Sequence, residues 1–135
     1  MMATMVHARQ VTLSIDAGAA LRQILGIMTD QLMVGEAGWG WDLDRVLELD
    51  ARLETAWDVE SWRTTSGDDA VVELGIDDAA LLLDGMAFTE VASADLPWVE
   101  MVRWTSDFVT AELRQHWSDD EWGDYQRSIG RRLPY

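Results

Sequence analysis

At two places in the chain, a short run of alternating apolar and polar residues leads directly into a helical pattern. Val11, Leu13 and Ile15 alternate with polar residues before Asp16, and the same arrangement returns 61 positions later before Asp77. Alternation predicts a half-buried strand, and Asp is a favoured N-cap residue. The chain must therefore combine strands with helices. Duplication of a βα unit and a generic strand–cap–helix pattern both explain the repeat, and we expect the two strands to pair as neighbours.

The other periodicities predict a helix-rich α+β fold. The predicted strands span 9–15, 57–65 and 70–76, and the predicted helices span 16–33, 42–56, 78–92, 97–116 and 119–129. The order is β-α-α-β-β-α-α-α, with a small sheet of two to three strands covered by about five helices. No linker rich in Pro, Gly or Ser is present, so residues 1–135 are predicted to form a single domain. We expect a flexible N-terminus over 1–8 and a C-terminal tail over 130–135.

Capping residues and apolar stripes define how the helices should start and which sides they should bury. Predicted N-caps are Asp16, Asp42, Asp77 and Ser118, the last in a capping box with Glu121, and Pro97 suits a first helical position. The predicted buried side of the helix at 42–56 is Leu43, Val46, Leu47, Leu49 and Leu53. That of the helix at 97–116 is Trp98, Met101, Val102, Thr105, Phe108 and Val109. The helix at 78–92 is apolar on nearly every side, which predicts a central helix or an interface.

The charge balance limits the possible partners. The chain has 25 acidic residues and 10 basic ones, and its net charge is −15. Phosphates would be repelled, so direct binding of nucleic acid or of an anionic membrane is not expected. Between Arg63 and Arg103 lie nine acids and no base: Asp68, Asp69, Glu73, Asp77, Asp78, Asp84, Glu90, Asp95 and Glu100. Solubility and a codon bias that replaces Lys with Arg could explain this acidity, and the acids would then form a solvated surface. The alternative is that they form a docking face for a basic protein.

The aromatic residues suggest a place for that docking face. Eight Trp residues is a high number for 135 positions, and Trp is mostly buried in cores or interfaces. Two of them lie in a loop rich in Gly beside acids, where they could bind Arg side chains. The predicted partner-binding residues are Glu36, Trp39, Trp41, Asp42, Asp44, Glu48, Asp68, Asp69 and Asp84. The alternative is that this loop folds back and places its rings in the core.

No constellation for catalysis is recognisable. The chain lacks Cys and has only His7 and His116, and no nucleophile elbow or phosphate-binding loop is present, so we predict no catalytic residue and no cofactor. Asp84 interrupts the most apolar helix and should be exposed, paired with an Arg, or functional. Glu112 and His116 are four residues apart and share a helix face, which makes them weak candidates for metal ligands. A solvated helix end is the simpler interpretation of that pair.

The leading hypothesis is a non-catalytic protein-binding domain. It would be an acidic inhibitor or regulator of a basic partner, of the immunity-protein, antitoxin or anti-defence type. One alternative is a small enzyme or ligand-binding domain with a pocket lined by Trp and acids. Another is a homo-oligomeric structural subunit that dimerises through the helix at 78–92. The absence of Cys, of a signal-peptide pattern and of a long apolar run predicts a cytoplasmic protein without a membrane span.

Overall fold

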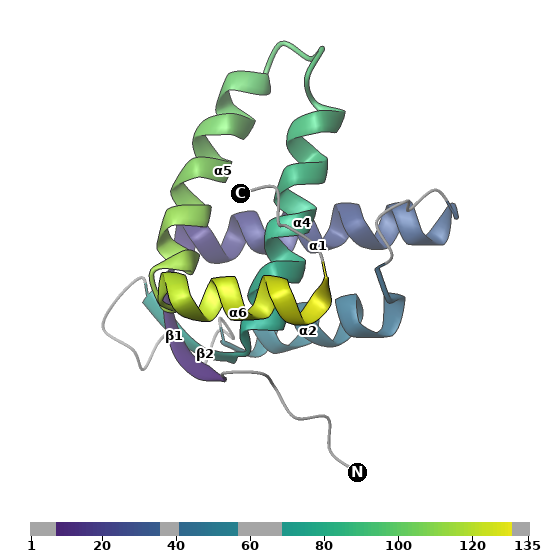
Figure 1. Cartoon of the computed structure of the whole chain (residues 1–135). Coiled ribbons are helices and arrows are strands. Elements are labelled where there is room, and N and C mark those ends of the chain that lie inside the picture. The colour runs from purple at the N-terminus through teal and green to yellow at the C-terminus, as the bar shows by residue number, and fades with distance from the viewer. Residues whose placement is uncertain (1–7, 36–40, 57–68, 131–135) are drawn as a thin grey trace.

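The computed structural model describes residues 8–35, 41–56 and 69–130 (Figure 1). In these residues the chain forms one sheet and five helices. The elements are β1 (Arg9–Ser14), α1 (Ile15–Met33), α2 (Leu43–Ala56), β2 (Asp69–Leu74), α4 (Ile76–Ala92), α5 (Val99–Arg114) and α6 (Asp119–Ile129). The helix-rich α+β class is thereby confirmed. The predicted strand at 57–65 lies outside the described residues.

The sheet consists of β1 and β2, which pair antiparallel with Arg9 opposite Leu74 and Ser14 opposite Asp69. The prediction that these two strands are neighbours is confirmed. Val11 and Leu13 of β1 and Val72 and Leu74 of β2 are buried. The intervening side chains Thr12, Val71 and Glu73 are exposed. The period of two thus turns one side of the sheet toward the helices and the other toward solvent.

Two of the predicted caps are wrong and two are confirmed. The hydroxyl of Ser14, not Asp16, caps α1 by accepting from the Ala17 amide at 3.2 Å. Gly75, not Asp77, is the N-cap residue of α4. β1 passes directly into α1, and only Gly75 separates β2 from α4. Each Asp therefore falls inside the first turn of its helix, where its charge complements the helix dipole. Asp42 caps α2, and Ser118 forms the predicted box with Glu121.

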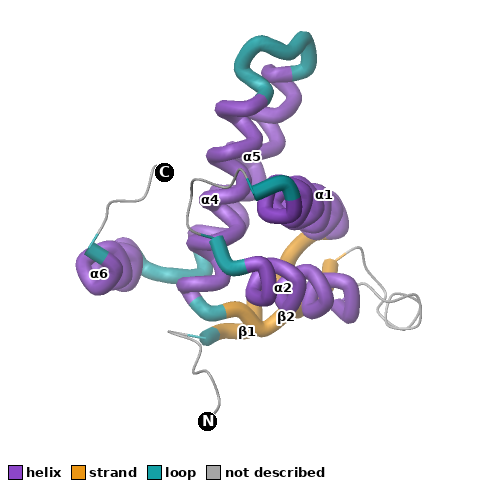
Figure 2. Tube along the Cα trace, turned by 90° about the vertical axis from the view of Figure 1, so that its right-hand side faces the viewer, coloured by secondary structure: helices purple, strands orange, loops and turns teal. Residues whose placement is uncertain are grey.

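α4 is the central helix of the molecule. It packs against α1, α5, α6 and β2, and most of its first eleven residues are buried. α1 and α6 lie on opposite sides of it, and α4 and α5 form a hairpin that rises above α1 (Figure 2). The apolar composition of α4 is explained by these contacts within the chain. A homodimer interface is therefore not needed to account for it.

The predicted buried stripes need correction at several positions. In α5 the buried residues are Ser106, Val109 and Leu113, whereas Trp98, Met101 and Phe108 are exposed. In α2, Val46, Leu49 and Leu53 are buried as predicted, but Leu47 is exposed. Leu47 lies outside the i, i+3, i+7 row that faces the core. Within the described residues, no helix is long and apolar enough to cross a membrane.

Candidate protein-binding surface

Four large apolar side chains are exposed in a row along α5. We call this row the α5 stripe: Trp98 is 51% exposed, Met101 65%, Trp104 69% and Phe108 39%. Their spacing of three to four residues places them on one side of the helix. The rings of Trp104 and Phe108 are stacked, with centroids 5.7 Å apart and planes inclined by 2°. The opposite side of α5 is held in the core by Val109 and Leu113.

The α5 stripe continues into a groove, which we call the corner groove. Its volume is about 510 Å³. Its walls come from α1 and from the α4–α5 hairpin. These elements meet at a corner, with the hairpin rising beside α1 (Figure 2). The groove is lined by Ala20, Gln23, Ile24 and Ile27 of α1, by Met86, Thr89 and Ser93 of α4 and its C-cap, and by Trp98, Met101, Val102, Thr105 and Ser106. Trp98 and Met101 belong to both features, so stripe and groove form one continuous apolar surface.

The elements that form this surface also carry exposed acidic side chains. Asp16 and Asp30 of α1, Asp95 between α4 and α5, and Asp107 of α5 are exposed and have no ion pair among the described residues. Glu100 is exposed as well and pairs with Arg103 at 2.7 Å. None of the residues that line the groove is basic. The rim of the surface is therefore negative, while its centre is apolar.

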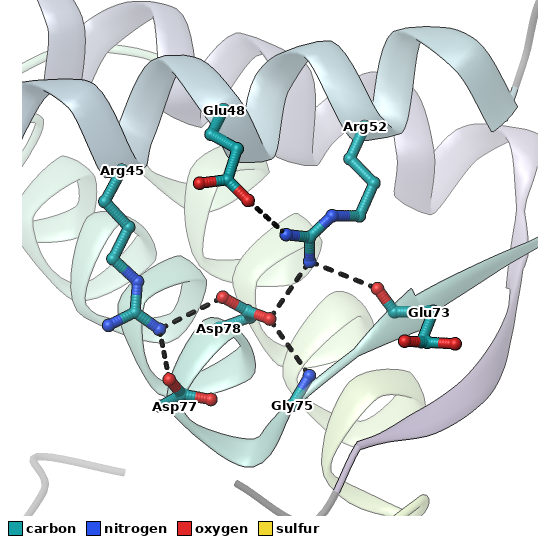
Figure 3. Close-up of polar contacts among 7 residues, drawn as sticks. All are labelled: Arg45, Glu48, Arg52, Glu73, Gly75, Asp77 and Asp78. Atoms are coloured by element: carbon teal, nitrogen blue, oxygen red, sulfur yellow. Dashed lines mark hydrogen bonds and ion pairs between the residues drawn. The ribbon is translucent and has the colours of Figure 1, made fainter. Parts of the chain in front are cut away.

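A second group of acids is paired with Arg side chains of the same chain (Figure 3). The Arg45 guanidinium donates to Asp77 at 2.6 Å and to Asp78 at 3.0 Å, and Arg52 donates to Asp78 at 3.0 Å and to Glu48 at 2.8 Å. Partial burial acts to lower the pKa of Arg45, but the Asp78 and Asp77 carboxylates outweigh it and hold this pKa above its ordinary value. Asp78 also accepts from the Gly75 amide at 3.0 Å. These contacts join α2 to the start of α4, which is a structural role.

Of the predicted partner-binding residues that the structure describes, some are exposed on α2 and others are buried. Glu36, Trp39 and Asp68 lie outside the described residues. Asp42 and Asp44 are exposed at the start of α2, Glu48 pairs with Arg52, and Asp69 is the first residue of β2. Trp41 is only 8% exposed, and its ring contacts Phe88 edge-on with centroids 5.6 Å apart. The alternative in which the loop supplies a ring to the core is therefore correct for Trp41.

Asp84 is buried within α4 at 5% exposure, so the option of an exposed side chain is wrong. It is not without an interaction partner, which fits the rule that buried carboxylates are compensated. Its position inside the central helix does not place it on the surface around α5.

The candidate metal ligands have other roles. The Glu112 carboxylate accepts from the Ser14 amide at 3.1 Å and from the Ser14 hydroxyl at 3.2 Å. This ties the C-terminal end of α5 to the junction of β1 and α1. His116 lies edge-on to Trp117, with centroids 6.3 Å apart. In the described part of the chain, no three His, Asp or Glu side chains are grouped as a metal site would require.

Sequence reasoning missed the α5 stripe because it assigned Trp98, Met101 and Phe108 to the core and did not include Trp104 in the predicted buried side. The sequence did hold a signal, since α5 carries apolar residues at two sets of positions. One set runs through 98, 101, 104 and 108, and the other through 102, 109 and 113. A surface helix needs only one apolar side to pack on the core, so a second apolar side indicates exposed apolar residues.

Comparisons of the chain with protein-family models, with curated proteins and with solved structures find no match.

Proposed function

We propose that this protein is a non-catalytic protein-binding domain that docks a basic partner on the α5 stripe and the corner groove. By binding this partner, the protein would inhibit or regulate it. The observation that carries the proposal is the exposure of Trp98, Met101, Trp104 and Phe108 along one helix. Contiguous exposed apolar surface with a polar rim is typical of protein interaction sites.

The residue types support a protein partner. Trp, Phe and Met are enriched at interfaces, and Trp in particular contributes large shares of binding free energy when it becomes fully desolvated. Trp104 and Phe108 are already stacked, so their rings lose little conformational freedom on binding. A preformed aromatic centre of this kind favours a partner with a complementary apolar patch.

The charges support a basic partner. The rim acids Asp16, Asp30, Asp95 and Asp107 have no ion pair among the described residues, unlike the acids that Arg45 and Arg52 neutralise. A surface of this sign attracts a basic protein over a distance of about 10 Å at moderate ionic strength. It also opposes a second copy of the same chain, since each copy has a net charge of −15.

The proposal is tested by capture from a lysate of the native host with immobilised protein, at low and at high salt. We expect a basic protein to be captured at low salt and to be bound less at high salt. Replacing Trp104 by Ser should weaken that capture by at least about 2 kcal/mol, or roughly 30-fold. Because Trp104 is exposed, the variant should fold normally.

Ile129→Ser is the matched control, because Ile129 is an apolar residue of α6 that is 40% exposed. It should capture the partner as well as the wild type. Absence of any basic partner at low salt would overturn the proposal. So would a partner that Trp104→Ser retains undiminished, because the α5 stripe would then not be the contact surface.

A further inference from the structure

The walls of the corner groove are built from helices. α1 contributes Ala20, Gln23, Ile24 and Ile27, and α4 and α5 contribute the remaining side chains. Backbone N–H and C=O groups inside a helix are already hydrogen-bonded within it. An extended segment lying in the groove would therefore find few partners for its own backbone groups, and leaving them unpaired is costly. A helix satisfies its own backbone and needs only side-chain contacts.

Two acids of α1 flank its groove-lining residues along the helix. Asp16, Ala20, Gln23, Ile27 and Asp30 follow one another at intervals of three and four residues, which places them on one side of α1. The groove-lining part from Ala20 to Ile27 is about 10 Å long, and the two Asp residues are about 21 Å apart along the helix axis. The groove therefore has an apolar centre of about two helical turns with a negative charge beyond each end.

We infer that the groove binds an amphipathic helix of the basic partner. The helix lies along α1 against the α4–α5 hairpin, since side chains of these elements line the groove. Its apolar side chains at i, i+3 or i+4, and i+7 contact Ile24, Ile27 and Trp98. Its Arg or Lys residues before and after that stretch pair with Asp16 and Asp30. This inference rests on the proposed function and names the part of the partner that is recognised.

Charge argues for this occupant over a second copy of the chain. A second copy would have to place a strongly acidic helix between Asp16 and Asp30, which like charges oppose. The bases of a basic helix would instead pair with the acids beyond both ends of the groove, and no base of this protein would be needed for that. Of the bases closest in sequence, Arg22 pairs with Asp50 at 3.1 Å and Arg103 with Glu100.

The test uses three synthetic peptides of about 16 residues with binding measured by calorimetry. The first has Leu on one helical side with Arg at both ends. The second has the same composition in scrambled order, so that Leu no longer forms one side. The third has Glu in place of Arg. We expect the first peptide to bind at least about tenfold more tightly than the others, because only it matches both the apolar centre and the ends. Equal binding of the first and second peptides would overturn the inference.

Variants locate the binding. Gln23→Trp fills the groove from an exposed position and should abolish binding of the first peptide. The double variant Asp16→Asn with Asp30→Asn should weaken it about fivefold. The matched control is Asp44→Asn with Asp120→Asn, which changes the net charge equally at exposed sites on α2 and α6 and should leave affinity nearly unchanged. Equal weakening by both double variants would show general charge attraction and would contradict the inference.

The two proposals fail in different ways. If the native partner is captured through Trp104 while the first peptide binds no better than the scrambled one, the helix inference is wrong and the proposed function stands. If capture of the partner is indifferent to Trp104, the proposed function is wrong.

Discussion

At the scale of single residues, the contact between α2 and α4 depends on the Asp78 carboxylate. Its side chain is only 7% exposed and accepts hydrogen bonds from Arg45, Arg52 and the Gly75 amide. A buried charge of this kind is tolerated only while its partners are in place. In this cluster Asp77 and Asp78 are paired with Arg45 and Arg52. These two acids therefore do not contribute to an acidic docking face, which the sequence suggested between Arg63 and Arg103.

Asp78→Asn should lower the free energy of unfolding by about 3 kcal/mol, because it leaves two partly buried guanidinium groups without their shared anion. Chemical denaturation measures this change. Asp44→Asn, at an exposed position in the same region, should alter stability by no more than about 0.5 kcal/mol. Similar losses in the two variants would mean that the cluster contributes no more than a surface charge.

Glu121 makes the stability of the fold depend on pH. The Ser118 backbone amide that bonds its carboxylate, together with the Arg9 guanidinium, outweighs desolvation and holds the pKa of Glu121 below its ordinary value of 4.5. A depressed folded pKa gives stability that is present above the unfolded pKa and is lost as pH falls through the folded pKa. The wild type should therefore lose its advantage over Glu121→Gln as pH falls from about 6 to about 3.

Gln at this position keeps an acceptor for the Ser118 amide, so the comparison isolates the charge. Thermal unfolding across this pH range gives the difference between the two proteins. A difference that stays constant with pH would show that the Glu121 charge is not stabilised in the folded state.

At the scale of elements, α1 and α4 pack closely enough to require a glycine. A Cβ at Gly85 would meet the sulfur of Met28 and lie 2.5 Å from Cγ2 of Ile24. Ile24 is β-branched and Met28 is fully buried, so neither side chain can move away freely. Gly26 lies in α1 as well, but a Cβ there would meet nothing within 4 Å.

The same substitution should therefore have opposite effects at the two glycines. Gly85→Ala should destabilise the protein by about 1–3 kcal/mol through overpacking, despite the better helix propensity of Ala. Gly26→Ala should stabilise it by about 0.5–1 kcal/mol, because Ala costs less backbone entropy in a helix. Urea denaturation of both variants decides the matter. Stabilisation at both positions would mean that the contact between α1 and α4 is loose.

At the scale of the whole molecule, three Arg residues connect elements that are distant in sequence. Arg22 joins α1 to Asp50 of α2, Arg45 joins α2 to α4, and Arg9 joins β1 to Glu121 of α6. These pairs involve β1, α1, α2, α4 and α6. With 25 acids and only 10 bases, a large excess of negative charge still remains. Self-repulsion of that excess opposes the compact state.

Salt should therefore stabilise the fold. Raising NaCl from about 0.02 M to about 0.5 M shortens the screening length from roughly 20 Å to about 4 Å, which weakens the repulsion among the exposed acids. The urea concentration at the unfolding midpoint should therefore rise with salt. Urea is the suitable denaturant because it carries no charge and does not itself change the ionic strength. A midpoint that falls with salt would mean that the attractive Arg pairs outweigh the net repulsion.

The sequence alone determined the type and approximate position of every described element. Strand alternation, helical spacing and the caps at Asp42 and Ser118 are local signals, because they depend on neighbours within a few residues. The pairing of the two strands was also predictable from their matching patterns. Where the local prediction failed, at Asp16 and Asp77, the error was a shift of two residues in where each helix begins.

Only the tertiary structure decided which side of each helix is buried and which acids stay unpaired. α5 has two apolar sides, and periodicity cannot choose between them, because the choice depends on where α1 and α4 pack. Likewise, nothing local to Trp41 sends its ring to Phe88, and nothing local to Glu112 sends its carboxylate to Ser14, 98 residues away. The candidate surface on α5 arises from those long-range contacts, since they leave Trp98, Met101, Trp104 and Phe108 on the outside.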